Sequence, residues 1–227
     1  MAPQASRIRP SSARARLPER APAARPDHVP HLAGTPCSPP RPSDEPSDQP
    51  EFFSVGREDA LDLCVRGLGP DDAAAFRALR LEGLVRHPCA FAASHDEEVG
   101  QSLAEVAGRL ERQPVFGAFD RAGLVGMAGF AVPPLAKKRH KGVLWGVYVR
   151  EEARGRGVGR ALVLAVIEHA RAQVVQLHAA VVNSNEAARA LYRSLGFATY
   201  GVEPRGLFCA GQYFDQELML LMLDREY

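Results

Sequence analysis

The chain has 227 residues, of which 46% are hydrophobic, and 28 lysines and arginines against 27 acidic residues give a formal net charge of +1. So small a net charge argues against a protein whose overall field attracts nucleic acid or a membrane surface. No apolar run is long enough to span a bilayer and the first residues lack the apolar core of a secretory signal, so we expect a cytoplasmic protein.

The first part of the chain differs in composition from the rest. Twelve of the eighteen prolines lie within the first fifty positions, together with many arginines, alanines and serines. Such a segment buries too little apolar surface to offset its chain entropy. We therefore expect a disordered tail over 1–57 and a single folded domain over 58–227.

Four cysteines are spread through the chain, and no two of them stand at the Cys-x-x-Cys spacing of a zinc site: Cys37, Cys64, Cys89 and Cys209. This distribution predicts no zinc, and no other metal, as a cofactor. It also predicts reduced thiols, as in cytosolic proteins.

The folded part opens with alternating apolar and polar residues over 61–68, which predict a strand. Pro70 followed by two acidic residues predicts the start of a helix, and Pro88 marks its end. A helical stripe of apolar residues predicts a second helix over 96–110, which Gly100 weakens.

Shorter elements follow in regular order. Strands over 114–119 and 124–132 flank a good hairpin turn. Further strands are predicted at 142–149, 174–182, 197–202 and 214–223, the last two joined by a loop that holds Gly206 and Gly211, with helices at 158–171 and 186–195. This alternation predicts an α/β domain with a mixed sheet.

A glycine-rich turn joins the strand at 142–149 to the following helix. Its glycines alternate at Gly155, Gly157 and Gly159, so several backbone N–H groups converge where the helix dipole is positive, an arrangement that attracts phosphate. Three arginines add to the same preference: Arg154, Arg156 and Arg160. A nucleotide-triphosphate loop is excluded because Arg160-Ala161 stands where Lys-Ser/Thr is required. A dinucleotide fingerprint is excluded because the glycine spacing differs and 173–182 contains no acidic residue.

The segment Arg154-Gly155-Arg156-Gly157-Val158-Gly159 resembles the acyl-CoA pyrophosphate loop, Arg/Gln-x-x-Gly-x-Gly/Ala, of the GNAT superfamily of N-acetyltransferases. Downstream, Asn185, Ala188, Leu191, Tyr192 and Gly196-Phe197 stand as in the family's second motif, Asn-x-x-Ala-x-x-Leu-Tyr-x-x-x-Gly-Phe. The resemblance covers 62–223. It implies a GNAT-type mixed, mostly antiparallel sheet flanked by helices, with two parallel central strands that splay apart around the pantetheine arm of CoA.

The resemblance also implies a reaction, the transfer of an acetyl group from acetyl-CoA to a primary amine of a small molecule or of a protein. The alternative is a catalytically inactive acyl-CoA-binding sensor or interaction module, which gains some weight because the central strands lack the glutamate of many family members. The expected partners are acetyl-CoA and an amine, without nucleic acid or membrane, for a monomer or homodimer.

Roles for individual residues follow from the same resemblance. The backbones of Val147 and Tyr148 would pair with pantetheine, and the N–H of Val149 would stabilise the oxyanion. The pyrophosphate would bind to Gly155, Arg156, Gly157, Val158, Gly159 and Arg160. Arg154 would meet the adenosine 3′-phosphate or the rim of the site. Asn185 would cap the short helix and also contact pantetheine.

Proton transfer is the least determined part of the prediction. Tyr192 would protonate the leaving thiolate, with a plain core aromatic as the alternative. His178 is the titratable side chain on the central strands and a candidate base, with a purely structural histidine as an equal alternative. Glu82 and Glu203 are remoter candidates, and a chain of waters without a dedicated base is also open. The basic run 137–141 reads as a solvated loop or as a rim that meets CoA phosphate. We expect the acceptor pocket among the first two helices, the loop 87–91 and the hairpin near 203–206.

Overall fold

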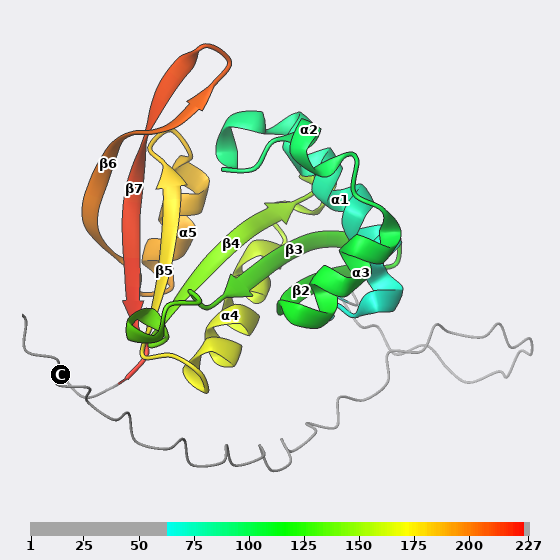
Figure 1. The fold of residues 1–227 in the computed structure, drawn as a ribbon, viewed down its shortest axis with the longest axis horizontal. Helices are drawn as coiled ribbons and strands as arrows, with labels where there is room; N and C mark the ends of the chain where they lie inside the picture. The colour runs from blue at the N-terminus through cyan, green and yellow to red at the C-terminus, as the bar shows by residue number, and fades with distance from the viewer. Residues whose placement is uncertain (1–62, 225–227) are drawn as a thin grey trace, which may run out of the picture. The chain divides into compact units, whose positions relative to one another are not determined.

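The computed structural model describes residues 63–224, so the disordered tail predicted over 1–57 lies outside the described residues (Figure 1). Within them a seven-stranded sheet has the order β1-β2-β3-β4-β5-β7-β6. Its strands are β1 (Cys64–Gly67), β2 (Val115–Asp120), β3 (Gly123–Ala131), β4 (Lys141–Val149), β5 (Gln176–Val182), β6 (Ala198–Cys209) and β7 (Gln212–Met222). Only β4 and β5 run parallel among these neighbours, which confirms the mixed, mostly antiparallel sheet.

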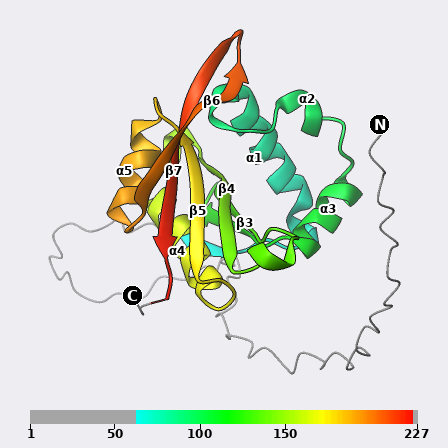
Figure 2. The same cartoon turned by 60° about the vertical axis from the view of Figure 1, so that its left-hand side comes forward.

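Helices cover both faces of the sheet (Figure 2). They are α1 (Ala73–Arg86), α2 (His95–Glu98), α3 (Leu103–Arg112), α4 (Val158–Arg171) and α5 (Glu186–Ser194). Short 3₁₀ turns, η1 (Pro70–Asp72), η2 (Pro88–Ala90), η3 (Ala136–Lys138) and η4 (Glu151–Ala153), connect them to the strands. No helix between residues 63 and 224 is long and apolar enough to cross a membrane.

The helix α4 illustrates why this sequence folds as it does. Its apolar residues recur at helical spacing, and Leu162, Val163, Val166 and Ala170 are fully buried in the core against the sheet. A second core cluster packs α1 and α3 against the other face, with Phe76 and Leu79 fully buried. The sheet is therefore sandwiched between two apolar layers.

The second predicted helix, over 96–110, is in fact two helices. Ser94 begins α2 and Ser102 begins α3, and each serine accepts a hydrogen bond from the backbone N–H three residues on while a glutamate there bonds back. Two capping boxes in succession stop one helix and start another. Gly100 lies in the exposed link between them.

The central strands separate as predicted. β4 and β5 pair only over Lys141–Val143 and Gln176–His178, and beyond these residues the two strands diverge (Figure 1). A bulge in β4, where Gly146 has φ +64°, adds to the local bend. The open ends of both strands leave backbone groups without a strand partner at the upper end of the gap.

The last hairpin differs from its prediction. The expected loop around Gly206 is strand, because β6 continues to Cys209 and β7 starts at Gln212. The β6–β7 register has two irregularities, and the one between Glu203 and Leu207 absorbs the Pro204–Gly206 segment. The connection is a tight turn in which Ala210 and Gly211 both have positive φ.

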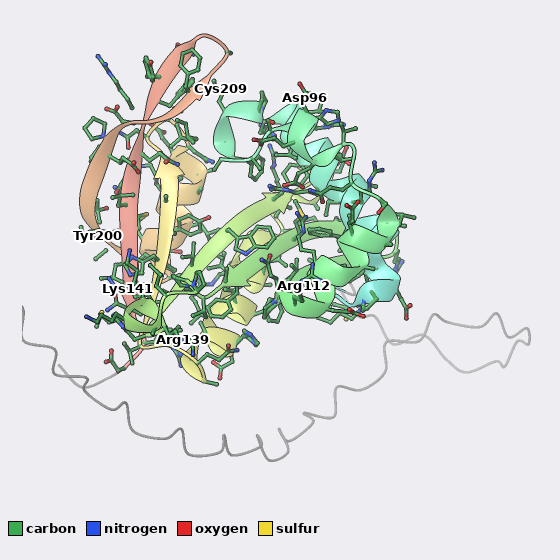
Figure 3. All side chains as sticks on the ribbon, in the orientation of Figure 1. Asp96, Arg112, Arg139, Lys141, Tyr200 and Cys209 are labelled. Carbon is green, nitrogen blue, oxygen red and sulfur yellow. A yellow bond between two sulfur atoms is a disulfide. The ribbon has the colours of Figure 1, made fainter. Side chains whose placement is uncertain are left out.

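The prediction of reduced thiols is wrong for one pair of cysteines. Cys89 in η2 and Cys209 at the end of β6 form a disulfide, and their Cα atoms are 5.5 Å apart. Figure 3 labels Cys209 near the tip of the β6–β7 hairpin. Although 120 positions separate them in sequence, the fold brings η2 against the hairpin. The bond ties together two segments on opposite sides of the gap between β4 and β5.

Candidate functional site

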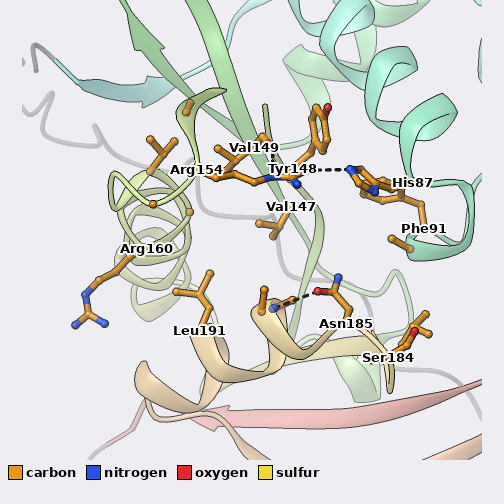
Figure 4. Close-up of a pocket in the computed structure, with 18 of the residues that line it drawn as sticks. His87, Phe91, Val147, Tyr148, Val149, Arg154, Arg160, Ser184, Asn185 and Leu191 are labelled. Carbon is orange, nitrogen blue, oxygen red and sulfur yellow. Dashed lines mark hydrogen bonds between the residues drawn. The ribbon is translucent and has the colours of Figure 1, made fainter. Parts of the chain in front are cut away.

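A cavity of about 720 Å³ opens where β4 ends (Figure 4). The carboxyl end of β4, the start of α4, the start of α5 and the segment His87–Phe91 enclose it. Apolar side chains dominate its walls. Figure 4 shows Val147 on β4 facing α5, from which Asn185 and Leu191 extend into the same space. Most of the residues assigned to the cofactor from sequence therefore surround one cavity.

The end of β4 presents free backbone to this cavity. The N–H of Arg150 bonds to the carbonyl of Val125 on β3, so the backbone groups of Val149, one residue earlier, face the opposite way. The carbonyl of Val149 accepts instead from Nε of Arg154, at 3.1 Å. Val147 lies two residues further back and faces the same side, where β5 has already diverged.

The glycine-rich turn has the backbone that a phosphate loop requires. Gly155 and Gly157 have φ of +75° and +79°, a region that other residues rarely adopt, and Gly157 is the N-cap of α4. No atom lies within 4 Å of a β-carbon built on either glycine, so both face open space. The turn thus exposes the first N–H groups of α4 to the cavity.

The side chains of the three arginines of the turn have different partners. Arg160 lines the cavity and donates to Ser194 on α5. Arg154 crosses its mouth, where Nη2 lies 2.9 Å from Nε2 of His87. Arg156 does not line the cavity: its side chain pairs with Asp120 at the β2–β3 turn, at 3.4 Å. Only its backbone remains available at the predicted pyrophosphate position.

Asn185 has the capping position that the sequence predicts. Its side-chain oxygen accepts from the N–H of Ala188 at 3.2 Å, which completes the start of α5. The side-chain nitrogen is left to donate, and Asn185 lines the cavity beside Ser184 (Figure 4). Cap and cavity wall are therefore combined in one residue.

Tyr192 lies in the core rather than in the lining of the cavity. It is 6% exposed, its ring centroid is 5.5 Å from that of Phe197, and burial raises its pKa to about 12. Proton transfer from such a phenol to a thiolate, whose thiol has a pKa near 8.5, is unfavourable by roughly 5 kcal/mol. Asn185 and Tyr192, two helical turns apart, thus meet different surroundings.

His178 also lies away from the cavity. It sits where β4 and β5 still pair, Nε2 is 2.8 Å from the side chain of Gln176, and its ring packs edge-on against Tyr200. Burial, with smaller contributions from Lys141 and His140, lowers its pKa. Of the alternatives, Glu82 contacts Tyr148 and Arg150 behind the strand and is not part of the cavity wall.

The acceptor segments predicted from sequence are only partly brought to the cavity. The loop 87–91 lines it, and Phe91 is one of its walls. The hairpin near 203–206 does not, because Arg205 instead stacks on Tyr213 at 5.3 Å. The basic run 137–141 lies at the opposite end of β4 from Val149, so it is a solvated loop and not a rim of this cavity.

Sequence reasoning placed His87 in the loop 87–91 but gave its side chain no chemical role, and the imidazole lines the cavity together with Tyr148, Arg154 and Arg160. Arginine only donates, so Nε2 of His87 is the acceptor in this contact with Arg154. Its position directly before Pro88, at the end of α1, was the available signal. No carboxylate lines the cavity within 63–224.

The structure combines a mixed sheet whose central strands splay apart with a cavity bounded by a glycine-rich helix start. Comparison with known families gives the identity. The model of the acetyltransferase (GNAT) family matches residues 80–197, more than half of the chain, and the chain belongs to that family.

Individual relatives agree with this assignment. An L-methionine sulfoximine/L-methionine sulfone acetyltransferase of Pseudomonas paraeruginosa is 42% identical over 79 residues, 34% of this chain and 46% of that protein. The N-alpha-acetyltransferase RimI of Mycobacterium tuberculosis is 38% identical over 93 residues, 39% of this chain and 54% of that protein. The chain thus spans about half the length of these curated relatives. The structure of Salmonella typhimurium yncA with its cofactor acetyl-CoA has a TM-score of 0.62 at 25% identity, and the match covers 73% of this chain and 96% of that one.

Proposed function

We propose that this protein transfers an acetyl group from acetyl-CoA to a primary amine. The observation that carries the proposal is the convergence on one cavity of the unpaired β4 backbone, the left-handed glycine turn and Asn185. Family membership supports the same activity, as does the bound acetyl-CoA in the yncA structure.

The cavity fits the parts of acetyl-CoA in order. A diphosphate suits the N–H groups of Gly157, Val158 and Gly159 at the positive end of α4, with Arg160 beside them. The two amides of pantetheine suit the exposed backbone of Val147 and Val149 and the amide of Asn185, as an added strand would. We assign to Arg154 the closing of the cavity mouth rather than a phosphate contact, because it holds Val149 and His87 together.

Catalysis would then rest on orientation and on an oxyanion contact. A thioester carbonyl beside the N–H of Val149 would meet a fixed donor as negative charge develops on its oxygen. Holding the amine next to that carbonyl supplies several kcal/mol more. The C–N bond forms as the C–S bond breaks.

Two protons must move in this reaction. The acceptor ammonium loses one before attack, to solvent or to His87 once Arg154 has released Nε2. The second passes from the attacking nitrogen to the departing sulfur, and a thiol with a pKa near 8.5 is a good leaving group without a strong acid. Tyr192 remains a predicted proton donor from sequence, and its burial in the core argues against that role.

The second candidate function is an acyl-CoA-binding module without chemistry. It is favoured by one observation, that the predicted base and acid, His178 and Tyr192, do not line the cavity. We rank it below the transferase because neither group is needed for the orientation and oxyanion effects.

Release of CoA thiol from acetyl-CoA across a panel of primary amines tests the proposal, with calorimetry of CoA binding in parallel. Amine-dependent release supports the transferase, whereas tight CoA binding without release on any amine supports the binding module. In the same assay, a loss of kcat of tenfold or more in Tyr192→Phe, with CoA affinity unchanged, would restore Tyr192 as the proton donor. An unchanged kcat would remove it.

A further inference from the structure

A buried cluster of charge lies directly behind the cavity wall. Arg80 on α1 is 5% exposed and Glu98 at the end of α2 is 8% exposed. Nε and Nη2 of Arg80 both donate to the carboxylate of Glu98, at 2.8–3.2 Å. Nη2 of Arg109 on α3 lies 3.6 Å from Oε2 of the same carboxylate, which Nε of Arg80 also contacts.

The charges of this cluster do not balance. Burial opposes ionisation of Glu98, but Arg80 and Arg109 together lower its pKa, so it is a carboxylate at neutral pH. Two guanidinium groups against one carboxylate leave one positive charge. Aromatic rings surround it, with Phe91 5.1 Å from the guanidinium of Arg80 and Trp145 5.9 Å from each of the two. Arg109 is partly exposed to solvent, whereas the guanidinium of Arg80 is buried, and buried positive charge is costly unless an anion or water joins it.

One edge of Arg80 is left without a partner. Its Nη1 is buried and makes no hydrogen bond with any residue of the described chain, 63–224. This nitrogen points at the β4 bulge, since a β-carbon built on Gly146 would lie 3.5 Å from it. Glu98 grips the Nε–Nη2 edge, so it is a positioning residue that turns Nη1 toward β4.

The unpartnered edge lies next to the part of the cavity wall that β4 and Phe91 form. Gly146 directly precedes Val147, which lines the cavity, and Phe91 both lines the cavity and covers the guanidinium. Phe91 therefore stands between the guanidinium and the cavity, and its ring must turn aside for a ligand in the cavity to reach Arg80. An acceptor bound there would have its anionic group at Arg80 and its amine beside the β4 backbone.

We propose that Arg80 binds the carboxylate of the acceptor, and that the acceptor is a free α-amino acid rather than a peptide or a simple amine. In an α-amino acid the carboxylate and amine are attached to the same carbon, which suits a donor on Arg80 so close to Val147. A peptide N-terminus carries a neutral amide at that position. This inference rests on the proposed transferase activity and names its substrate class.

The step itself balances without further reactants. The neutral α-amine attacks the thioester carbonyl of acetyl-CoA, a C–N bond forms, the C–S bond breaks, and one amine proton ends on sulfur. The products are an N-acetyl amino acid and CoA. Arg80 holds the carboxylate throughout and takes no proton.

The test compares matched acceptors on the full-length protein at saturating acetyl-CoA. Thiol release is measured for a panel of L-α-amino acids that includes L-methionine sulfone, each paired with its carboxamide, and for an alanine-led tetrapeptide. A charge-assisted hydrogen bond predicts that the preferred amino acid exceeds its carboxamide by about 10- to 100-fold in kcat/KM. Equal use of the two, or preference for the peptide, overturns the inference while leaving the transferase intact.

Two variants separate recognition from packing. Arg80→Lys keeps one positive charge but cannot bind Glu98 and the acceptor carboxylate at the same time as the guanidinium does. The preference for the amino acid over its carboxamide therefore falls to within about threefold. Arg77→Lys is the matched control, because Arg77 stands one turn earlier on α1 and pins the same α2–α3 link through the carbonyls of Val99 and Gln101. It retains the full preference. Thermal unfolding checks that both variants fold. If Arg80→Lys lowers kcat/KM equally for the amino acid and its carboxamide, Arg80 has a structural role only and does not bind the acceptor.

A failure of the transferase proposal can be distinguished from a failure of the proposed carboxylate site. If no amine supports thiol release, calorimetry of the amino acids and carboxamides into the CoA-loaded protein decides the matter. Binding that requires the carboxylate and is lost in Arg80→Lys sustains the site without the chemistry. No binding of either ligand overturns both proposals.

Discussion

A substitution of Gly157 tests the proposed phosphate contact most directly. In Gly157→Asp the new residue must adopt φ +79°, which costs about 1–2 kcal/mol for an L-residue. Its β-carbon meets no atom within 4 Å, so nothing in the protein clashes and the fold survives. The carboxylate stands where α4 presents its first N–H groups. At a few ångströms from a diphosphate, repulsion of roughly 3 kcal/mol follows, about a hundredfold in the Kd for CoA.

A matched control is available at the far hairpin. Gly211 has φ +78° and also has nothing within 4 Å of a built β-carbon, so Gly211→Asp adds the same strain and charge away from the cavity. We expect both variants to lose similar stability in urea, and calorimetry with CoA to separate them. If Gly157→Asp binds CoA as tightly as Gly211→Asp, the phosphate does not sit on this turn and the reasoning fails.

Three further predictions concern stability. Reduction of the Cys89–Cys209 bond, or the substitution Cys209→Ser, should lower the free energy of unfolding by about 4–5 kcal/mol because it releases a loop of about 120 residues. Dithiothreitol should have no effect on the Cys209→Ser variant. Equal urea midpoints of the parent protein with and without reductant would contradict this prediction. A hydrogen bond from Thr199, together with hydrogen bonds from Arg189 and Arg193, lowers the pKa of Glu217 from 4.5 to about 2. The ionised Glu217 therefore stabilises the folded protein fully above pH 4.5, and this stabilisation is lost as the pH falls toward 2. Glu217→Gln should therefore lose about 3 kcal/mol at pH 7, with the difference from the parent narrowing in acid, and a constant difference down to pH 2.5 would argue against it. In Gly129→Ala the new β-carbon would lie 2.1 Å from the Trp145 ring, so we expect a loss of about 3 kcal/mol or more in thermal unfolding, and a loss below 1 kcal/mol would show that Trp145 repacks freely.

Local signals account for what could be predicted from the sequence. The helix expected over 158–171 is α4 residue for residue, because the glycine turn fixes its start and its apolar stripe fixes its buried face. Asn185 was recognisable as a cap for the same reason, since a cap acts on backbone only three residues away. Strand ends differed from prediction by a few residues, except at the end of β6, where pairing across the hairpin overrides Pro204 and Gly206.

The side-chain placements that the sequence did not indicate depend on contacts that the whole fold creates. Arg156 turns away from the cavity because Asp120, 36 positions earlier, holds it. Tyr192 turns inward because Phe197 and the core accept its ring. The disulfide and the cluster around Arg80 join segments whose proximity only the fold creates. Helical spacing gives the face from which a side chain leaves, but not what it meets.

The short parallel contact between β4 and β5 has a consequence for motion. Only three residues of each strand join the half of the sheet formed by β1 to β4 to the half formed by β5, β7 and β6. A ligand that fills the wedge above this seam would bridge both halves through its own amides. Amide hydrogen exchange near Val147 and Val182 should then slow together on CoA binding, so that the cosubstrate stiffens the protein as a missing strand would.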